Sequence, residues 1–177
     1  MTIYVALFRG INVGGKHILP MQDLRELLAE LGCEDIQTYI QSGNAVFSSA
    51  ANATELSREI RDAVEAQFGF ASQVLLLTVE RFAAIASANP YPEVEATPKV
   101  LHVWFLTEKA GNPDIDAMNL IKAENERFTL TDDALYLHAP DGIGRSRLAG
   151  KVDRHLGVST TARNWRTVRK LLDLGKS

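Results

Sequence analysis

The sequence has a single cysteine, Cys33, among its 177 residues. One cysteine can form no intramolecular disulfide and no cysteine-rich metal site, so a disulfide-stapled secreted domain is excluded. The four histidines, His17, His102, His138 and His155, show no metal-ligand spacing, and we expect no metal ion. These absences predict a protein of a reducing compartment.

Long apolar runs are also absent. The first apolar run, residues 3–8, is too short for a signal peptide or a membrane span, and no basic residues precede it. We therefore expect a cytoplasmic protein that does not associate with membranes.

An excess of one charge is lacking as well. The formal net charge is -3, with 19 basic and 22 acidic side chains, which gives no overall attraction to nucleic-acid backbones. The distribution is uneven, because residues 1–140 carry 10 basic and 19 acidic side chains whereas residues 141–177 carry 9 and 3. An anionic partner is therefore expected first near the C-terminus.

The first half of the chain predicts six elements in the order βαββαβ. Strands are expected over residues 3–9, 36–42, 45–48 and 73–78, with Gly43-Asn44 as a two-residue hairpin turn. One helix follows Pro20 and ends at Gly32; the other is capped by Asn52 and ends at Gly69. This order is that of the ferredoxin-like unit.

The second half partly repeats that order. A short helix over 79–88 and a linker over 89–98 lead to strands at 100–106, 127–130 and 134–138. Helices are expected from Ser146 to Leu156 and from Thr161 to Leu174, the latter where a last strand would complete the unit. The predicted fold class is α+β, with two small ferredoxin-like subdomains over 1–88 and 99–177, the second ending in an extra helix instead of a last strand.

Residues 10–16 match the G-x-x-x-x-G-K part of a phosphate-binding P-loop and follow a strand. However, His17 stands where magnesium binding needs Ser or Thr, and Pro20 inside the helix would cost about 3 kcal/mol. A nucleoside triphosphatase is therefore not favoured. Two interpretations remain: glycine amides and Lys16 form an anion-binding nest, or the segment is a glycine-rich turn with a solvated lysine.

Topology predicts that this loop meets the following hairpin. In a ferredoxin-like unit the first two strands run the same way, so the end of the first lies beside the turn after the second. Arg9, Asn12 and Lys16 should then approach Gln41, Ser42 and Asn44, and together they could bind a small polar or phosphorylated ligand. Alternatively, Asn12 and Asn44 are turn residues that bond their own backbone.

Residues 141–151 form a second segment rich in glycine and basic residues. Ser146 as a helix cap beside Arg145 would offer an anion site, although a basic surface loop is the alternative. In the last predicted helix, Arg163, Arg166 and Lys170 share one face, which is either a solvated surface or a binding face for RNA or another anion. Trp165, on the opposite face, is expected to be a packing anchor.

The leading hypothesis is a protein that binds a small anionic, phosphate-bearing ligand. The proposed ligand-binding residues are Arg9, Asn12, Lys16, Gln41, Ser42, Asn44, Arg145, Ser146, Arg163 and Asn164. The alternatives are a nucleic-acid-binding module that uses the basic C-terminal helix and the strand aromatics, a protein interaction module, or an enzyme. No catalytic residue is assigned, because no serine or cysteine has the sequence context of a nucleophile. The sequence also assigns no cofactor and no oligomeric state.

Four motifs together resemble a known family. They are residues 7–16 (LFRGINVGGK), 38–44 (TYIQSGN), 140–146 (PDGIGRS) and 161–165 (TARNW). In this combination the chain resembles the bacterial family catalogued as domain of unknown function 1697. The resemblance implies two small α+β, ferredoxin-like subdomains and implies no reaction, cofactor or catalytic residue.

Overall fold

The fold, in a computed structural model that describes residues 1–176, is α+β. The described residues form two four-stranded antiparallel sheets and six α-helices. They divide into two compact units, one comprising Met1–Ala84 with Arg169–Ser177 and the other Ile85–Val168. The predicted linker over 89–98 therefore lies within the second unit.

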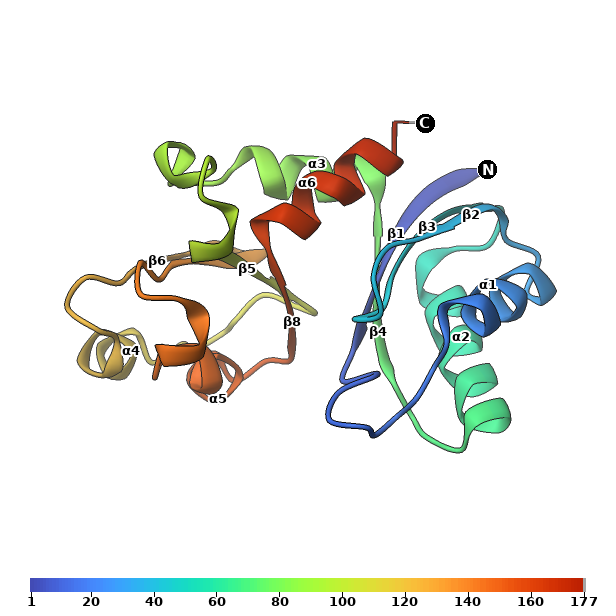
Figure 1. The fold of residues 1–177 in the computed structure, drawn as a ribbon, viewed down its shortest axis with the longest axis horizontal. Coiled ribbons are helices and arrows are strands. Elements are labelled where there is room, and N and C mark those ends of the chain that lie inside the picture. The colour runs from blue at the N-terminus through green and yellow to red at the C-terminus, as the bar shows by residue number, and fades with distance from the viewer. Residues whose placement is uncertain (177) are drawn as a thin grey trace. The chain divides into compact units, whose positions relative to one another are not determined.

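The first unit contains one of the sheets and two helices that cover one of its faces (Figure 1). Its elements are β1 (Thr2–Arg9), α1 (Met21–Glu30), β2 (Glu34–Thr38), β3 (Asn44–Ser49), α2 (Ala53–Phe68) and β4 (Gln73–Thr78). The strand order is β2-β3-β1-β4. Tyr4, Ala6 and Phe8 alternate along β1 and pack in the core with Leu28 of α1 and Ile60 of α2. The opposite face of β1 carries Val5 and Leu7, which are also buried.

The boundaries of α2 follow from local signals that the sequence shows. Asn52 accepts a hydrogen bond from the Glu55 amide and donates one to the Glu55 carboxylate, which together cap the first turn. Gly69 ends the helix in the left-handed conformation, φ 76°. The predicted cap and stop of this helix are confirmed.

The second unit repeats the element order and the sheet topology of the first. Its elements are β5 (Leu101–Leu106), α4 (Ile115–Ile121), β6 (Arg127–Leu130), β7 (Ala134–His138), α5 (Val152–Leu156) and β8 (Thr160–Asn164), with strand order β6-β7-β5-β8. Its core contains Trp104 and Leu137 of the sheet and Met118 and Leu156 of the helices α4 and α5. Short 3-10 turns connect these elements: η1 (Pro92–Val94), η2 (Pro98–Val100), η3 (Ile143–Arg145) and η4 (Ala149–Lys151). Two helices, α3 (Val79–Ser87) and α6 (Trp165–Leu174), contain residues of both units.

The prediction that the second unit lacks its last strand is wrong. Residues 160–164 form β8, which pairs antiparallel with β5 and places Arg163 opposite Val103. The final helix begins only at Trp165. The βαββαβ series is therefore complete in both units.

Two further local predictions are corrected. Gly43-Asn44 is not a two-residue turn, because β2 ends at Thr38 and β3 begins at Asn44, and the loop between them is closed by a 2.9 Å hydrogen bond from the Tyr39 amide to the Asn44 carbonyl. No helix begins at Ser146, since the α-helical part of residues 146–156 is Val152–Leu156 and the preceding turns are 3-10.

Candidate functional site

The loop after β1 is a tight hairpin built on left-handed residues. The amide of Lys16 donates to the carbonyl of Val13 at 3.0 Å, and the amide of Asn12 donates to the carbonyl of His17, also at 3.0 Å. Five residues of this loop have positive φ angles, namely Gly10, Asn12, Gly14, Gly15 and His17. Glycine and asparagine tolerate this region best, which explains the three glycines and Asn12 among these five positions.

Asn12 joins this hairpin to a second loop of the first unit. Its Nδ2 donates to the carbonyl oxygens of Leu19 at 2.8 Å and of Gln41 at 2.7 Å, while its Oδ1 accepts from the Leu19 amide at 2.8 Å. The side-chain amide thus bridges the loop after β1 and the loop before β3. Residues 10–19 and 39–43 therefore meet at one edge of the first sheet.

The loop before β3 is fixed by Gly43 and Asn44. The Phe8 amide donates to the Gly43 carbonyl at 2.9 Å, and a Cβ on Gly43 would lie 2.6 Å from Ile11 Cδ1. Asn44 is fully buried, and its Nδ2 donates to the Tyr39 carbonyl and to Ser42 Oγ. Asn12 and Asn44 consequently brace backbone, as the turn-residue alternative for both predicted.

Four of the predicted residues of this unit are exposed at or beside these two loops. They are Arg9 at the end of β1, Lys16 in the hairpin, and Gln41 and Ser42 in the loop before β3. The sequence-predicted group is thus divided into two asparagines that hold the loops and four exposed residues, of which Ser42 also accepts a hydrogen bond from Asn44. Two cationic side chains, an amide and a hydroxyl at one sheet edge can neutralise and orient a small anion.

The predicted residues of the second unit have mainly structural partners. Ser146 Oγ accepts from the Ala149 amide at 3.1 Å, and Asn164 Oδ1 accepts from the Thr167 amide at 2.9 Å as the cap of α6. Arg163 lies in β8 with 9% of its surface exposed, donates to the Ala162 carbonyl at 2.7 Å, and has its pKa lowered to about 10 by burial. Of the four predicted residues in this unit, only Arg145, in η3, is exposed.

The features expected for nucleic-acid binding are arranged differently from the prediction. The sheet aromatics Tyr4, Phe8 and Phe47 are buried in the core of the first unit, so they offer no stacking platform to bases. Arg163 is not on the last helix, whereas Arg166 and Lys170 of α6 are exposed. The predicted platform is therefore absent from the face that these aromatics occupy.

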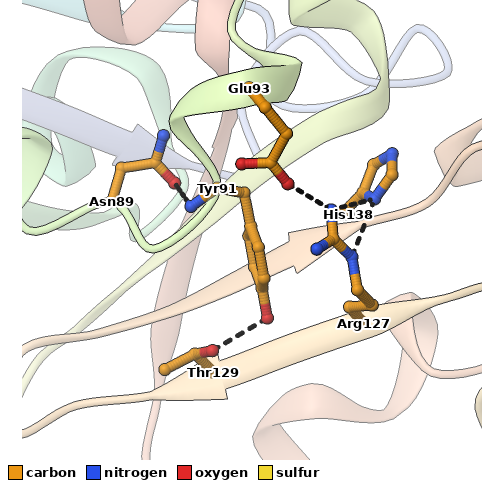
Figure 2. Close-up of polar contacts among 6 residues, drawn as sticks. All are labelled: Asn89, Tyr91, Glu93, Arg127, Thr129 and His138. Carbon is orange, nitrogen blue, oxygen red and sulfur yellow. Dashed lines mark hydrogen bonds and ion pairs between the residues drawn. The ribbon is translucent and has the colours of Figure 1, made fainter.

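A polar cluster in the second unit was not predicted (Figure 2). Arg127 of β6 donates from Nη2 to a Glu93 carboxylate oxygen at 2.7 Å and from Nε to His138 Nδ1 at 3.3 Å. Its guanidinium lies 4.6 Å from the centre of the Tyr91 ring, and the Tyr91 hydroxyl is 2.8 Å from Thr129 Oγ1. The cluster thus fastens η1 and its flanking residues to β6 and β7.

The ionisation of this cluster follows from its contacts. Burial and the neighbouring Arg127 charge lower the pKa of His138, which favours the neutral imidazole, and its Nδ1 accepts the hydrogen bond from Arg127 Nε. The Arg127 hydrogen bond lowers the pKa of Glu93. The sequence carried one signal for this cluster, because the predicted strands 127–130 and 134–138 pair Arg127 with His138 directly.

Two other groups capable of chemistry, Cys33 and His102, have pKa values shifted by burial. Burial raises the pKa of the Cys33 thiol, which disfavours the thiolate. Burial lowers the pKa of His102 to about 4, and its Nδ1 is buried without a hydrogen-bond partner among the described residues. Within residues 1–176, no three His, Cys, Asp or Glu side chains gather in a way that could hold a metal ion. In the same range, no helix is both long and apolar enough to cross a bilayer.

The fold has a counterpart among solved structures. A conserved bacterial protein from Streptococcus pneumoniae is similar over 98% of this chain and 98% of its own, with a TM-score of 0.71 and 23% sequence identity. At this identity the similarity concerns the fold alone. No curated protein matches the chain.

The family resemblance is confirmed by a family model. The model described as protein of unknown function (DUF1697) matches residues 1–136, which is more than half of the chain. The chain belongs to this family.

Proposed function

We propose that the protein binds a small anionic, phosphate-bearing ligand at the edge of the first sheet where residues 9–16 and 39–43 meet. The observation that carries the proposal is the 2.7 Å hydrogen bond from Asn12 Nδ2 to the Gln41 carbonyl, which holds these two loops together. The bond places the exposed Lys16 hairpin in the same neighbourhood as the exposed Gln41 and Ser42.

The chemistry of this edge suits an anion. Lys16 supplies a compact, mobile charge, and Arg9, at the end of β1, supplies a planar guanidinium that can donate two parallel hydrogen bonds to a phosphate. The backbone of the hairpin is already held in left-handed conformations, so little further ordering is needed when a ligand binds.

The second unit is not required for this proposal. The side chains of Ser146, Arg163 and Asn164 make structural hydrogen bonds, and Arg145 alone of the predicted group there is exposed. We propose further that both units are ferredoxin-like folds, because each has the order βαββαβ and the same strand arrangement. The protein is expected to act in the cytoplasm.

The test is a binding screen with a matched lysine control. Wild type, Lys16→Ala and Lys99→Ala are titrated with inorganic phosphate and with mononucleotides. Calorimetry measures the heat of binding, and thermal unfolding measures the shift in melting temperature that each ligand causes. Lys99 is an exposed lysine of the second unit and belongs to neither of the two loops, so its loss removes the same charge without changing the residues of the proposed site. We expect wild type and Lys99→Ala to bind, and Lys16→Ala to bind at least tenfold more weakly.

Two outcomes contradict the proposal. Absence of binding to any phosphate by wild type rejects it, and so does equal binding by wild type and Lys16→Ala. Salt-dependent binding of single-stranded RNA that is lost in an Arg166→Ala, Lys170→Ala double variant would instead support the nucleic-acid alternative.

A further inference from the structure

Three exposed β-branched residues are chain neighbours of the residues that the Asn12 hydrogen bonds join. Val13 is 65% exposed, Ile18 is 54% exposed and Ile40 is 49% exposed. Each is a direct chain neighbour of a residue in the Asn12 hydrogen-bond group, namely Asn12 itself, Leu19 and Gln41. The two loops that Asn12 joins therefore carry exposed apolar residues as well as the exposed Lys16. We call Val13, Ile18 and Ile40 the apolar rim.

Ile40 is held in a conformation that its side chain disfavours. Its φ angle is 49°, in the left-handed region, where a β-branched residue is a clear outlier. Because half of the side chain faces solvent, burial in the core does not offset this strain. Glycine or asparagine would suit the backbone better, so the local conformation does not favour isoleucine at this position. Strained residues of this kind gather at functional sites.

We propose that the apolar rim contacts the apolar or aromatic body of the bound ligand, so that the protein binds amphiphilic phosphate monoesters in preference to inorganic phosphate or hydrophilic sugar phosphates. The inference rests on the proposed function, since Lys16 and Arg9 would hold the phosphate group of the same ligand. The anionic end lies against the cations, and the apolar body lies over Val13, Ile18 and Ile40.

The ligand is a free organic phosphate rather than a lipid headgroup in a bilayer. Attraction to an anionic membrane surface needs a cluster of basic residues. Residues 1–140 carry 10 basic against 19 acidic side chains, and residues 10–20 contain one lysine and no arginine. The single lysine in this segment can pair with one phosphate group, but it does not form such a cluster.

The preference has an expected size. Each buried methylene group contributes about fourfold in affinity. A phenyl or hexyl ester that covers the apolar rim should therefore bind at least tenfold more tightly than inorganic phosphate. Glycerol phosphate should bind with nearly the same affinity as inorganic phosphate, because its glycerol group is hydrophilic.

The experiment compares four phosphates on matched variants of the full chain. Inorganic phosphate, glycerol phosphate, phenyl phosphate and hexyl phosphate are titrated by calorimetry into wild type, Ile40→Asn, Val13→Thr and Leu120→Gln. Leu120 is 85% exposed on α4 in the second unit and controls for the loss of an exposed apolar side chain elsewhere. Thermal unfolding of each variant verifies that it folds.

We expect phenyl and hexyl phosphate to bind wild type and Leu120→Gln at least tenfold more tightly than inorganic phosphate. In Ile40→Asn and Val13→Thr the ratio of the affinity for phenyl or hexyl phosphate to the affinity for inorganic phosphate should fall toward one. The affinity for inorganic phosphate itself should stay the same. Equal affinity of wild type for all four phosphates would overturn the rim inference and leave the proposed function standing.

Three other results overturn the inference in distinct ways. If no phosphate binds, the proposed function fails with it. If benzyl alcohol binds as tightly as phenyl phosphate, the charge is not recognised and both fail. If wild type sediments with phosphatidylglycerol vesicles but binds no free ester, the phosphate group that it recognises belongs to a membrane lipid, and the inference is wrong.

Discussion

The side-chain amide of Asn12 donates a hydrogen bond of 2.7 Å to the backbone carbonyl of Gln41, 29 positions further along the chain. The same side chain pairs with both the N–H and the C=O of Leu19. One residue thus satisfies three backbone groups on two loops that regular secondary structure leaves without partners. The arrangement of the candidate site depends on this residue more than on any cation in it.

Replacement of Asn12 should destabilise the protein. Asn12→Ala removes three hydrogen bonds and places alanine at φ 54°, for an expected loss of about 2–4 kcal/mol in the free energy of unfolding. Asn12→Gly removes the bonds but suits the backbone, so it should lose about 1 kcal/mol less than Asn12→Ala. Urea denaturation of both variants measures the difference, and an unchanged midpoint in Asn12→Ala would contradict the bridging role.

Gly43 should tolerate no side chain. A Cβ there would lie 2.6 Å from Ile11 Cδ1 and 2.7 Å from Phe8 Cβ, at φ 87°. Gly43→Ala is expected to lose about 3 kcal/mol, because steric overlap adds to the left-handed backbone cost. Gly14→Ala is the matched control, since Gly14 also has a positive φ but nothing within 4 Å, and should lose only about 1 kcal/mol. Equal losses in denaturant melts would show that packing around Gly43 is loose.

Ile40→Asn should stabilise the fold. Asparagine is favoured over a β-branched residue at φ 49°, and the exposed isoleucine side chain contributes little core packing. We expect a gain of about 1 kcal/mol in the free energy of unfolding. Thermal and urea unfolding provide the measurement. A loss of stability would indicate that Ile40 serves the fold, and the strain argument for a ligand-contacting role would fall.

Stability should decline with acidification because of His102. Its folded-state pKa is about 4, below the ordinary value of 6.5, so the unfolded chain takes up a proton first as the pH falls. The contribution is fully present above about pH 6.5, is lost as the pH falls toward 4, and amounts to on the order of 3 kcal/mol. His138, whose pKa is also lowered, adds a slope of the same sign.

The measurement is a series of urea melts between pH 7.5 and 4 on wild type and His102→Leu. We expect the stability of wild type to fall faster than that of His102→Leu over this range, since leucine does not titrate. Parallel pH profiles would mean that His102 titrates normally in the folded protein.

Local signals in the sequence predicted both ends of α2 but not where α5 and α6 begin. Asn52, Glu55 and Gly69 define α2 through groups within a turn of one another, and these predictions are confirmed. In contrast, Arg163 fits the helical spacing of Arg166 and Lys170, so residues 161–164 were predicted as helix although they belong to strand β8. Its pairing partner Val103 is 60 positions away, and no local pattern reports such a contact.

The meeting of the two loops could be predicted from the sequence, whereas the backbone-bonding role of Asn12 and Asn44 was only one of two alternatives. The expected ferredoxin-like order, in which the first two strands run the same way, predicted that the loop after β1 approaches the loop before β3, and the hydrogen bond from Asn12 to Gln41 joins them. Whether an asparagine faces solvent or braces backbone depends on burial, which single residues do not reveal. The apolar rim was missed because exposure and the φ angle of Ile40 follow from the loop structure, not from its composition.

The shared strand order of the two units permits a comparison within one chain, as between two diverged copies. On the sheet face opposite the helices, β4 carries Leu75 and Leu77, which pair with Leu7 and Val5 of β1. The matching face of β8 carries Arg163, opposite Val103. A leucine-bearing strand in one copy therefore corresponds to an arginine-bearing strand in the other. Positions of this kind mark where the two sheets differ although they share one strand order.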